Sequence, residues 1–126
     1  MTKFLRLFTI TALLTLVASS YGCKKKDPSI LKVFVRSTSN ELITEAQVII
    51  IGDIHSDPAT AYYTDTLQTN SSGFAQFDMS AFFDAQDKNT TTGYFNILVK
   101  KDPKQATGYV KCRAHITAVQ TVVIDL

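Results

Sequence analysis

The stretch Ile30-Leu31-Lys32-Val33-Phe34-Val35-Arg36-Ser37 decides the fold, because apolar and polar side chains alternate along it. A period of two residues predicts a β-strand with one buried face. The inward set is Leu31, Val33 and Val35, and the outward set is Lys32, Phe34 and Arg36. A strand of this kind must be covered by a second layer, so the stretch predicts a sheet packed on another element.

Six more strands are predicted at short intervals, in residues 46–51, 61–69, 74–78, 94–100, 109–116 and 121–126. Turn-forming residues separate them, as in Asn70-Ser71-Ser72-Gly73. About seven short strands indicate an all-β fold, an antiparallel sandwich. Residues 46–51 are almost continuously apolar, which suits a central strand. The core residues expected from the other later strands are Tyr63, Leu67, Ala75, Phe77, Phe95, Ile97, Val99, Val110, Cys112, Ala114, Ile116, Val122, Ile124 and Leu126.

Residues 79–92 break the strand pattern. Met79, Phe82 and Phe83 have helical spacing, and Ser80 is a residue type that caps helices. We expect one short helical turn here, in a crossover between the two sheets. The aromatic side chains would close one end of the core.

The N-terminus has the order of a secretory signal: basic Lys3 and Arg6, an apolar run over residues 7–17, then small residues up to Gly22. The apolar run of 11 residues is shorter than the ~20 that a membrane-spanning helix needs. Because Cys23 follows directly, the segment resembles the signal of a Bacteroidetes-type bacterial lipoprotein. That resemblance implies cleavage after residue 22 and attachment of lipid, including a fatty acyl chain such as palmitate, to Cys23.

The predicted organisation is therefore a signal peptide (1–22), a lipidated Cys23 with a charged tether (23–29), and one domain (30–126). In lipoproteins of this kind an Asp after the lipidated Cys implies retention at the inner membrane. Here that residue is Lys24. The resemblance thus implies an outer-membrane lipoprotein, facing the periplasm or the cell surface.

The charge balance argues against nucleic-acid binding, and the cysteine content argues against thiol chemistry. Loss of Lys3 and Arg6 would reduce the 13 basic side chains to 11, equal to the 11 acidic ones, so no basic field for nucleic acid remains. With Cys23 lipidated, Cys112 would be alone, and we interpret it as a small buried apolar residue rather than a reactive thiol.

The strand motifs themselves resemble a family. They are Val33-x-Val35, Ala46-x-Val48-x-Ile50, Gly73-x-Ala75-x-Phe77, Gly93-x-Phe95-x-Ile97-x-Val99 and Val122-x-Ile124-x-Leu126. Together they resemble the carboxypeptidase regulatory-like and transthyretin-like domains, which are immunoglobulin-like sandwiches. The resemblance implies a domain that accompanies, displays or binds other molecules, and it does not imply catalysis.

The sequence raises two possible kinds of site chemistry, a metal site and a hydrolase active site. Asp53, His55 and Asp57 would share one side if the strand continued and could then hold a divalent ion; the alternative is a polar loop closed by Pro58. A transthyretin-like hydrolase ends in Tyr-Arg-Gly-Ser, whereas this chain ends in Val-Ile-Asp-Leu. No nucleophile-elbow, phosphate-loop or paired-cysteine motif occurs. We therefore predict no enzyme, no metal and no cofactor.

A candidate ligand face lies on the outward positions of the strand at 109–116. It combines Tyr109, Lys111, Arg113 and His115 with Phe34 and Arg36 of the first strand. Aromatic rings could stack on a sugar or peptide while the cations bind an acidic group; the alternative is a solvated face whose long side chains cover the sheet. In addition, Asp65-Thr66-Leu67 resembles the acceptor motif of Bacteroidetes O-glycosylation, which would modify Thr66.

The sequence thus predicts a lipid-anchored, non-catalytic module of the cell envelope that interacts with another envelope protein. The alternative is a surface lipoprotein that binds glycan or host matrix. An exposed apolar residue such as Phe34 or Tyr62 would be the protein contact.

Overall fold

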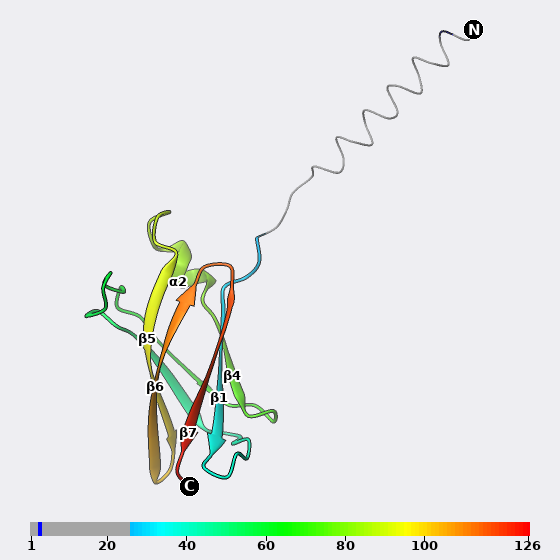
Figure 1. Ribbon diagram of the computed structural model, residues 1–126, viewed down its shortest axis with the longest axis vertical. Helices are drawn as coiled ribbons and strands as arrows, with labels where there is room; N and C mark the ends of the chain where they lie inside the picture. The colour runs from blue at the N-terminus through cyan, green and yellow to red at the C-terminus, as the bar shows by residue number, and fades with distance from the viewer. Residues whose placement is uncertain (1–2, 4–25) are drawn as a thin grey trace.

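The computed structural model describes residue 3 and residues 26–126. The predicted signal peptide, the lipidation of Cys23 and the start of the tether therefore lie outside the described residues. Over residues 26–126 the chain forms seven strands and one short helix (Figure 1). In chain order these are β1 (Ile30–Ser37), β2 (Gln47–Gly52), β3 (Thr64–Gln68), β4 (Phe74–Asp78), α2 (Ser80–Asp84), β5 (Thr92–Lys101), β6 (Lys104–Arg113) and β7 (Thr117–Ile124).

The strands form two packed sheets, which confirms the predicted sandwich. The three-stranded sheet has the order β4-β1-β7, and the four-stranded sheet has the order β3-β2-β5-β6. Strands β1 and β7 run parallel, with Val35 opposite Val122, so the prediction of a purely antiparallel fold is wrong. After β6, the chain crosses to the other sheet and begins β7 at the end where β1 also begins (Figure 1).

The core consists of the inward side chains of both sheets. Most of the predicted core residues are buried, including Val33, Val35 and Phe77, each fully inaccessible to solvent. Three predictions are wrong: Leu67 is 40% exposed, Ile116 50% and Leu126 53%. Leu67 lies on the edge strand β3, Ile116 lies in the turn before β7, and Leu126 follows the end of β7. At each of these places the opposite sheet leaves the side chain partly uncovered.

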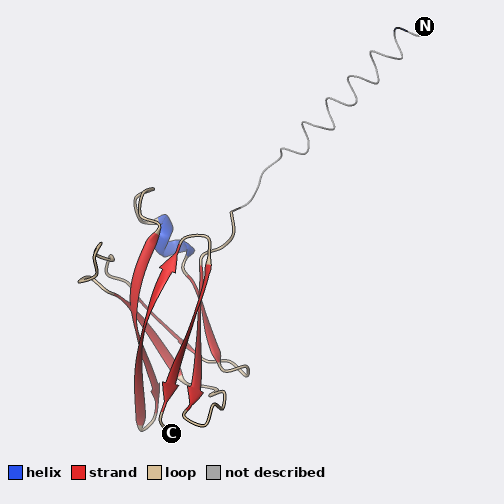
Figure 2. Ribbon diagram, in the orientation of Figure 1, coloured by secondary structure: helices blue, strands red, loops and turns tan. Residues whose placement is uncertain are grey.

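The segment after β4 is the predicted crossover. Helix α2 lies across one end of the strands (Figure 2), and it carries the buried Phe82 and Phe83. The Phe82 ring packs edge-on against Tyr63 and Phe95, with centroid distances of 5.3 and 5.1 Å. The aromatic side chains thus close this end of the core as predicted. Ser80 does not cap the helix, because Met79 occupies the N-cap position without a side-chain hydrogen bond. Among the described residues, no helix has the length and apolar character to cross a bilayer.

Candidate ligand-binding surface

A stacked pair of tyrosines lies on the outer face of the four-stranded sheet. In the β5–β6 pairing, Tyr94 is opposite Lys111 and Asn96 is opposite Tyr109, so the two tyrosines are diagonal neighbours on one face. Their rings are almost parallel, with a centroid distance of 6.2 Å and an interplanar angle of 20°. Tyr109 is 45% exposed, and its ring therefore offers a flat apolar surface to solvent.

Asp53 holds Tyr109 in this position. The Tyr109 hydroxyl donates a hydrogen bond of 2.7 Å to Asp53 Oδ2, and the His55 amide donates one of 3.0 Å to Asp53 Oδ1. The main-chain amide of Asp53 also donates to the carbonyl of Tyr94, at 2.9 Å. Together these bonds tie the end of β2 to β5 and β6, and the side-chain bond holds the Tyr109 ring before a ligand arrives.

The same contact changes both acid–base equilibria. The hydrogen bonds from Tyr109 and then from His55 lower the pKa of Asp53 below its ordinary value. The bond to Asp53 raises the pKa of Tyr109 to about 12. Across the neutral range Asp53 is therefore a carboxylate and Tyr109 a neutral phenol, which keeps the hydrogen bond intact.

Cations stand beside the tyrosine pair. The ammonium group of Lys111 lies 5.8 Å from the centroid of the Tyr94 ring. Arg113 is exposed at the end of β6 opposite Thr92, two residues along the strand from Lys111. We call Asp53, Tyr94, Tyr109, Lys111 and Arg113 the tyrosine surface.

Three of the predicted face residues lie elsewhere. Phe34 and Arg36 belong to β1 in the three-stranded sheet, so they cannot adjoin β6 in the other sheet. His115 follows the end of β6 with a positive φ of 63°, and its Nδ1 lies 2.8 Å from the Asp27 carbonyl oxygen. His115 therefore contacts the tether instead of completing the stripe. The sequence does not indicate that Tyr94 and Asp53 belong to this face, because their proximity to Tyr109 depends on strand pairing and on the position of the loop after β2.

The Asp53–Asp57 segment forms a loop rather than a continued strand. Strand β2 ends at Gly52, and the Ser56 hydroxyl bonds back to the Asp53 carbonyl oxygen at 2.8 Å. In the part of the chain that the structure describes, no group of three His, Cys, Asp or Glu side chains could hold a metal ion. The strand geometry that such a metal site would require is therefore not formed.

Two further predicted positions can be located. Thr66 is exposed on the edge strand β3, where its side chain is accessible to solvent. Cys112 is 1% exposed, and burial raises the pKa of its thiol to about 12. The interpretation of Cys112 as a small core residue is confirmed.

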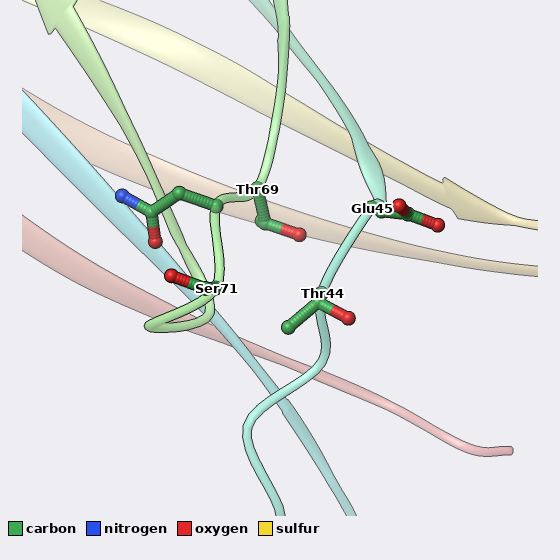
Figure 3. A pocket seen from close by; sticks show the side chains of 5 residues that line it. Thr44, Glu45, Thr69 and Ser71 are labelled. Carbon is green, nitrogen blue, oxygen red and sulfur yellow. The ribbon is translucent and has the colours of Figure 1, made fainter.

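A shallow hollow of about 310 Å³ lies between the β1–β2 and β3–β4 connections (Figure 3). The Thr69 hydroxyl points toward the segment with Thr44 and Glu45, donates to the Ile43 carbonyl at 2.8 Å and accepts from the Ala46 amide at 2.9 Å. Because these bonds join two loops, we interpret Thr69 as a residue that stabilises the fold rather than one that binds a ligand. Apart from the carboxylate of Glu45, the side chains that line the hollow are uncharged. The tyrosine surface, which has an aromatic pair and cations, is therefore the better candidate for a binding site.

Comparisons with known proteins add little. No model of a known protein family matches the chain, and no curated protein shows significant sequence similarity to it. Among solved structures the chain is similar to chlorocatechol 1,2-dioxygenase from Pseudomonas putida, with 15% identity and a TM-score of 0.48. The similarity covers 84% of this chain but 63% of that one, less than two thirds of its length. A similarity this distant does not bear on activity.

Proposed function

We propose that this protein is a non-catalytic interaction module of the bacterial cell envelope, anchored by lipid on Cys23 to the outer membrane. The anchor is supported by the signal-like residues 1–22 and the cysteine that follows them. The domain would be of the carboxypeptidase regulatory-like or transthyretin-like kind, within the observed two-sheet sandwich. One observation carries the interaction function: an exposed apolar face on the three-stranded sheet.

This face, which we call the Phe34 face, comprises Phe34, Phe74, Val119 and Val123. The two phenylalanine side chains are half-buried, and their rings are paired across β1 and β4 with a centroid distance of 5.1 Å. On the other side of β1, Val119 is 57% exposed and Val123 is 55% exposed. Apolar residues gathered on one sheet face in this way are typical of contact surfaces between proteins.

The charges around the Phe34 face indicate the chemistry of the partner. Lys32 lies with its ammonium group 5.2 Å from the Phe74 ring centroid, and Arg36 stands on the same side of β1. A protein surface with apolar side chains bordered by carboxylates would complement this arrangement. The proposed partner is therefore an envelope protein with an apolar, acid-rimmed patch.

Site-specific photo-crosslinking in intact cells tests this proposal. A photoreactive residue at Val119 or Val123 should give the same adduct mass, and Val123→Asp should abolish the adduct formed from position 119. The matched control is position 107, where Thr107 is exposed on the outer face of the other sheet. Adducts that are equally abundant from positions 107 and 119 would refute a specific interface on the Phe34 face.

A second candidate function, binding of an acidic glycan, is favoured by the tyrosine surface. The exposed ring of Tyr109 is fixed by Asp53, which suits stacking on the apolar face of a sugar. Lys111 and Arg113 follow on the same side of β6, where they could bind a carboxylate or sulfate group of that sugar. Asp53 keeps its own charge directed toward the Tyr109 hydroxyl.

This function predicts that the double variant Tyr109→Ala and Arg113→Ala loses capture of an acidic polysaccharide while its melting temperature falls only slightly, since both side chains are exposed. Thr107→Ala, on the same strand and face, is the control and should bind normally. Equal binding of charged and neutral polysaccharides by the unmodified protein would contradict the role assigned to Lys111 and Arg113. A large loss of thermal stability in the double variant would show instead that the tyrosine surface is structural.

A further inference from the structure

Three connections gather at the end of the sandwich where the tether enters (Figure 1). They are the β2–β3 loop, the β4–β5 connection with α2, and the β6–β7 turn. We call this the tether end. The opposite end carries the β1–β2, β3–β4 and β5–β6 connections and the C-terminus.

The tether is bonded to this end rather than leaving it freely. The His115 amide donates to the Ser29 hydroxyl at 2.7 Å, and the Met79 amide donates to the Ser29 carbonyl at 2.7 Å. Ser29 is 2% exposed, and the His115 ring contacts the Asp27 carbonyl oxygen at 2.8 Å. The chain is thus held against the domain as far back as Asp27.

Few residues remain between this held segment and the proposed lipid. Cys23 precedes Asp27 by four residues, a span of at most about 14 Å even when fully extended. By contrast, the ten residues of β5 extend over about 33 Å toward the opposite end. A lipid on Cys23 therefore keeps the tether end close to the headgroups and allows the other end to stand well away from them.

The side chains of the tether end suit a lipid surface. Ile54 is 52% exposed and Tyr62 75% exposed, both in the β2–β3 loop, and Ile116 is 50% exposed in the β6–β7 turn. Ile116 adjoins the tether directly, because its carbonyl accepts a hydrogen bond of 3.3 Å from the Ile30 amide. Exposed apolar side chains of this kind can enter the headgroup region, as the apolar face of an interfacial helix does.

Charge contributes mainly through the tether. The exposed ionic groups of the tether end are mixed in sign, with Lys88 and Arg113 offset by acidic side chains at Asp57, Asp84 and Asp87. The sequence, however, places three lysines directly after Cys23, where they can pair with anionic headgroups. The apolar side chains and these lysines act in the same direction.

We infer that the tether end lies against the membrane, with Ile116 and Ile54 among the lipid headgroups and the sandwich standing upright. This inference rests on the proposed lipid anchor. Its consequence is that the Phe34 face and the tyrosine surface both stand roughly perpendicular to the bilayer. Partners would then approach from the side, along the membrane.

Spin labelling of the lipidated protein tests the orientation. Labels would be placed singly at Ile116→Cys and Ile54→Cys, with Ser71→Cys at the opposite end as control, in vesicles of phosphatidylethanolamine and phosphatidylglycerol. Cys112 is buried and should remain unlabelled in the parent chain. We expect a water-soluble nickel chelate to collide several-fold less often with the labels at positions 116 and 54 than with the label at 71, and membrane-dissolved oxygen to show the reverse.

Two outcomes would overturn the inference, and they can be told apart. If mass spectrometry shows lipid on Cys23 but all three labels are equally accessible to the chelate, the orientation is wrong and the anchor stands. If the mature chain carries no lipid, the proposed anchor fails and the orientation fails with it. The Cys23→Ser protein, which has no lipid, should show full accessibility at all three labels.

Discussion

Thr69→Val should destabilise the domain by removing two hydrogen bonds from a closed site. Thr69 is 4% exposed, and its hydroxyl donates to the Ile43 carbonyl at 2.8 Å and accepts from the Ala46 amide at 2.9 Å. Ala46 is fully buried, so its amide has no access to water once the hydroxyl is gone. Valine has nearly the same shape as threonine, and the change therefore tests the bonds rather than the packing.

The magnitude follows from the cost of an unsatisfied buried donor, about 1–3 kcal/mol. We take about 2 kcal/mol for Thr69→Val, since the Ile43 carbonyl lies in a loop and can recover a bond to water. For a domain of this size 1 kcal/mol shifts the melting temperature by about 4–8 °C, so the expected fall is about 8–16 °C.

Urea and thermal unfolding of the two proteins would measure this difference. The control is Thr66→Val, the same substitution at an exposed position on the adjoining strand β3, for which we expect a change within about 0.5 kcal/mol. The urea dependence of the free energy of unfolding should be the same in all three proteins. If Thr69→Val and Thr66→Val changed stability equally, the reasoning from the Ala46 amide would be refuted.

Three further predictions concern the core and the tyrosine surface. Gly108→Ala places a methyl group 2.8 Å from Val122 Cγ2, and this overpacking should cost about 1–3 kcal/mol in urea unfolding. Adding Val122→Ala should make the two effects less than additive, and strict additivity would contradict the contact. Cys112 should not react with a thiol reagent at pH 8 until the protein is unfolded, because burial raises its pKa to about 12; rapid reaction of the native protein would show that the core opens. Tyr109→Phe should raise the pKa of Asp53 toward its ordinary value in a carboxyl NMR titration. Because the pKa of Asp53 is lower in the folded protein than in the unfolded chain, the ionised carboxylate stabilises the fold at pH values above the unfolded pKa. This contribution is lost as the pH falls through the folded pKa. Tyr109→Phe should therefore weaken the dependence of stability on pH in the acidic range. An unchanged titration of Asp53 in Tyr109→Phe would disprove the hydrogen bond.

Local sequence patterns located several elements closely. Strand β1 covers Ile30–Ser37 and strand β4 covers Phe74–Asp78, the bounds predicted from alternation and the adjoining turns. The alternation also placed Val33 and Phe77 in the core correctly. These features depend on neighbouring residues only, and for that reason they can be read from the sequence.

Other boundaries were displaced because pairing extends strands beyond their apolar residues. Strand β6 was predicted at 109–116 but runs over Lys104–Arg113, since each of its ten residues pairs with β5. The polar residues Lys104 and Gln105 join the strand through main-chain hydrogen bonds, and the pattern of apolar side chains does not reveal such bonds. Strand β7 likewise begins at Thr117 through its parallel pairing with β1 rather than at the predicted position 121.

The sequence by itself determined which face of most strands is buried, that aromatic residues close one end, and that Cys112 belongs to the core. Only the tertiary structure decided that β1 and β7 run parallel, that Phe34 and Tyr109 lie on different sheets, and that Asp53 meets Tyr109. The physical reason is that alternation specifies the direction of a side chain but not the neighbour of its strand. Those neighbours are chosen by main-chain pairing and core packing between residues as far apart as 30 and 117.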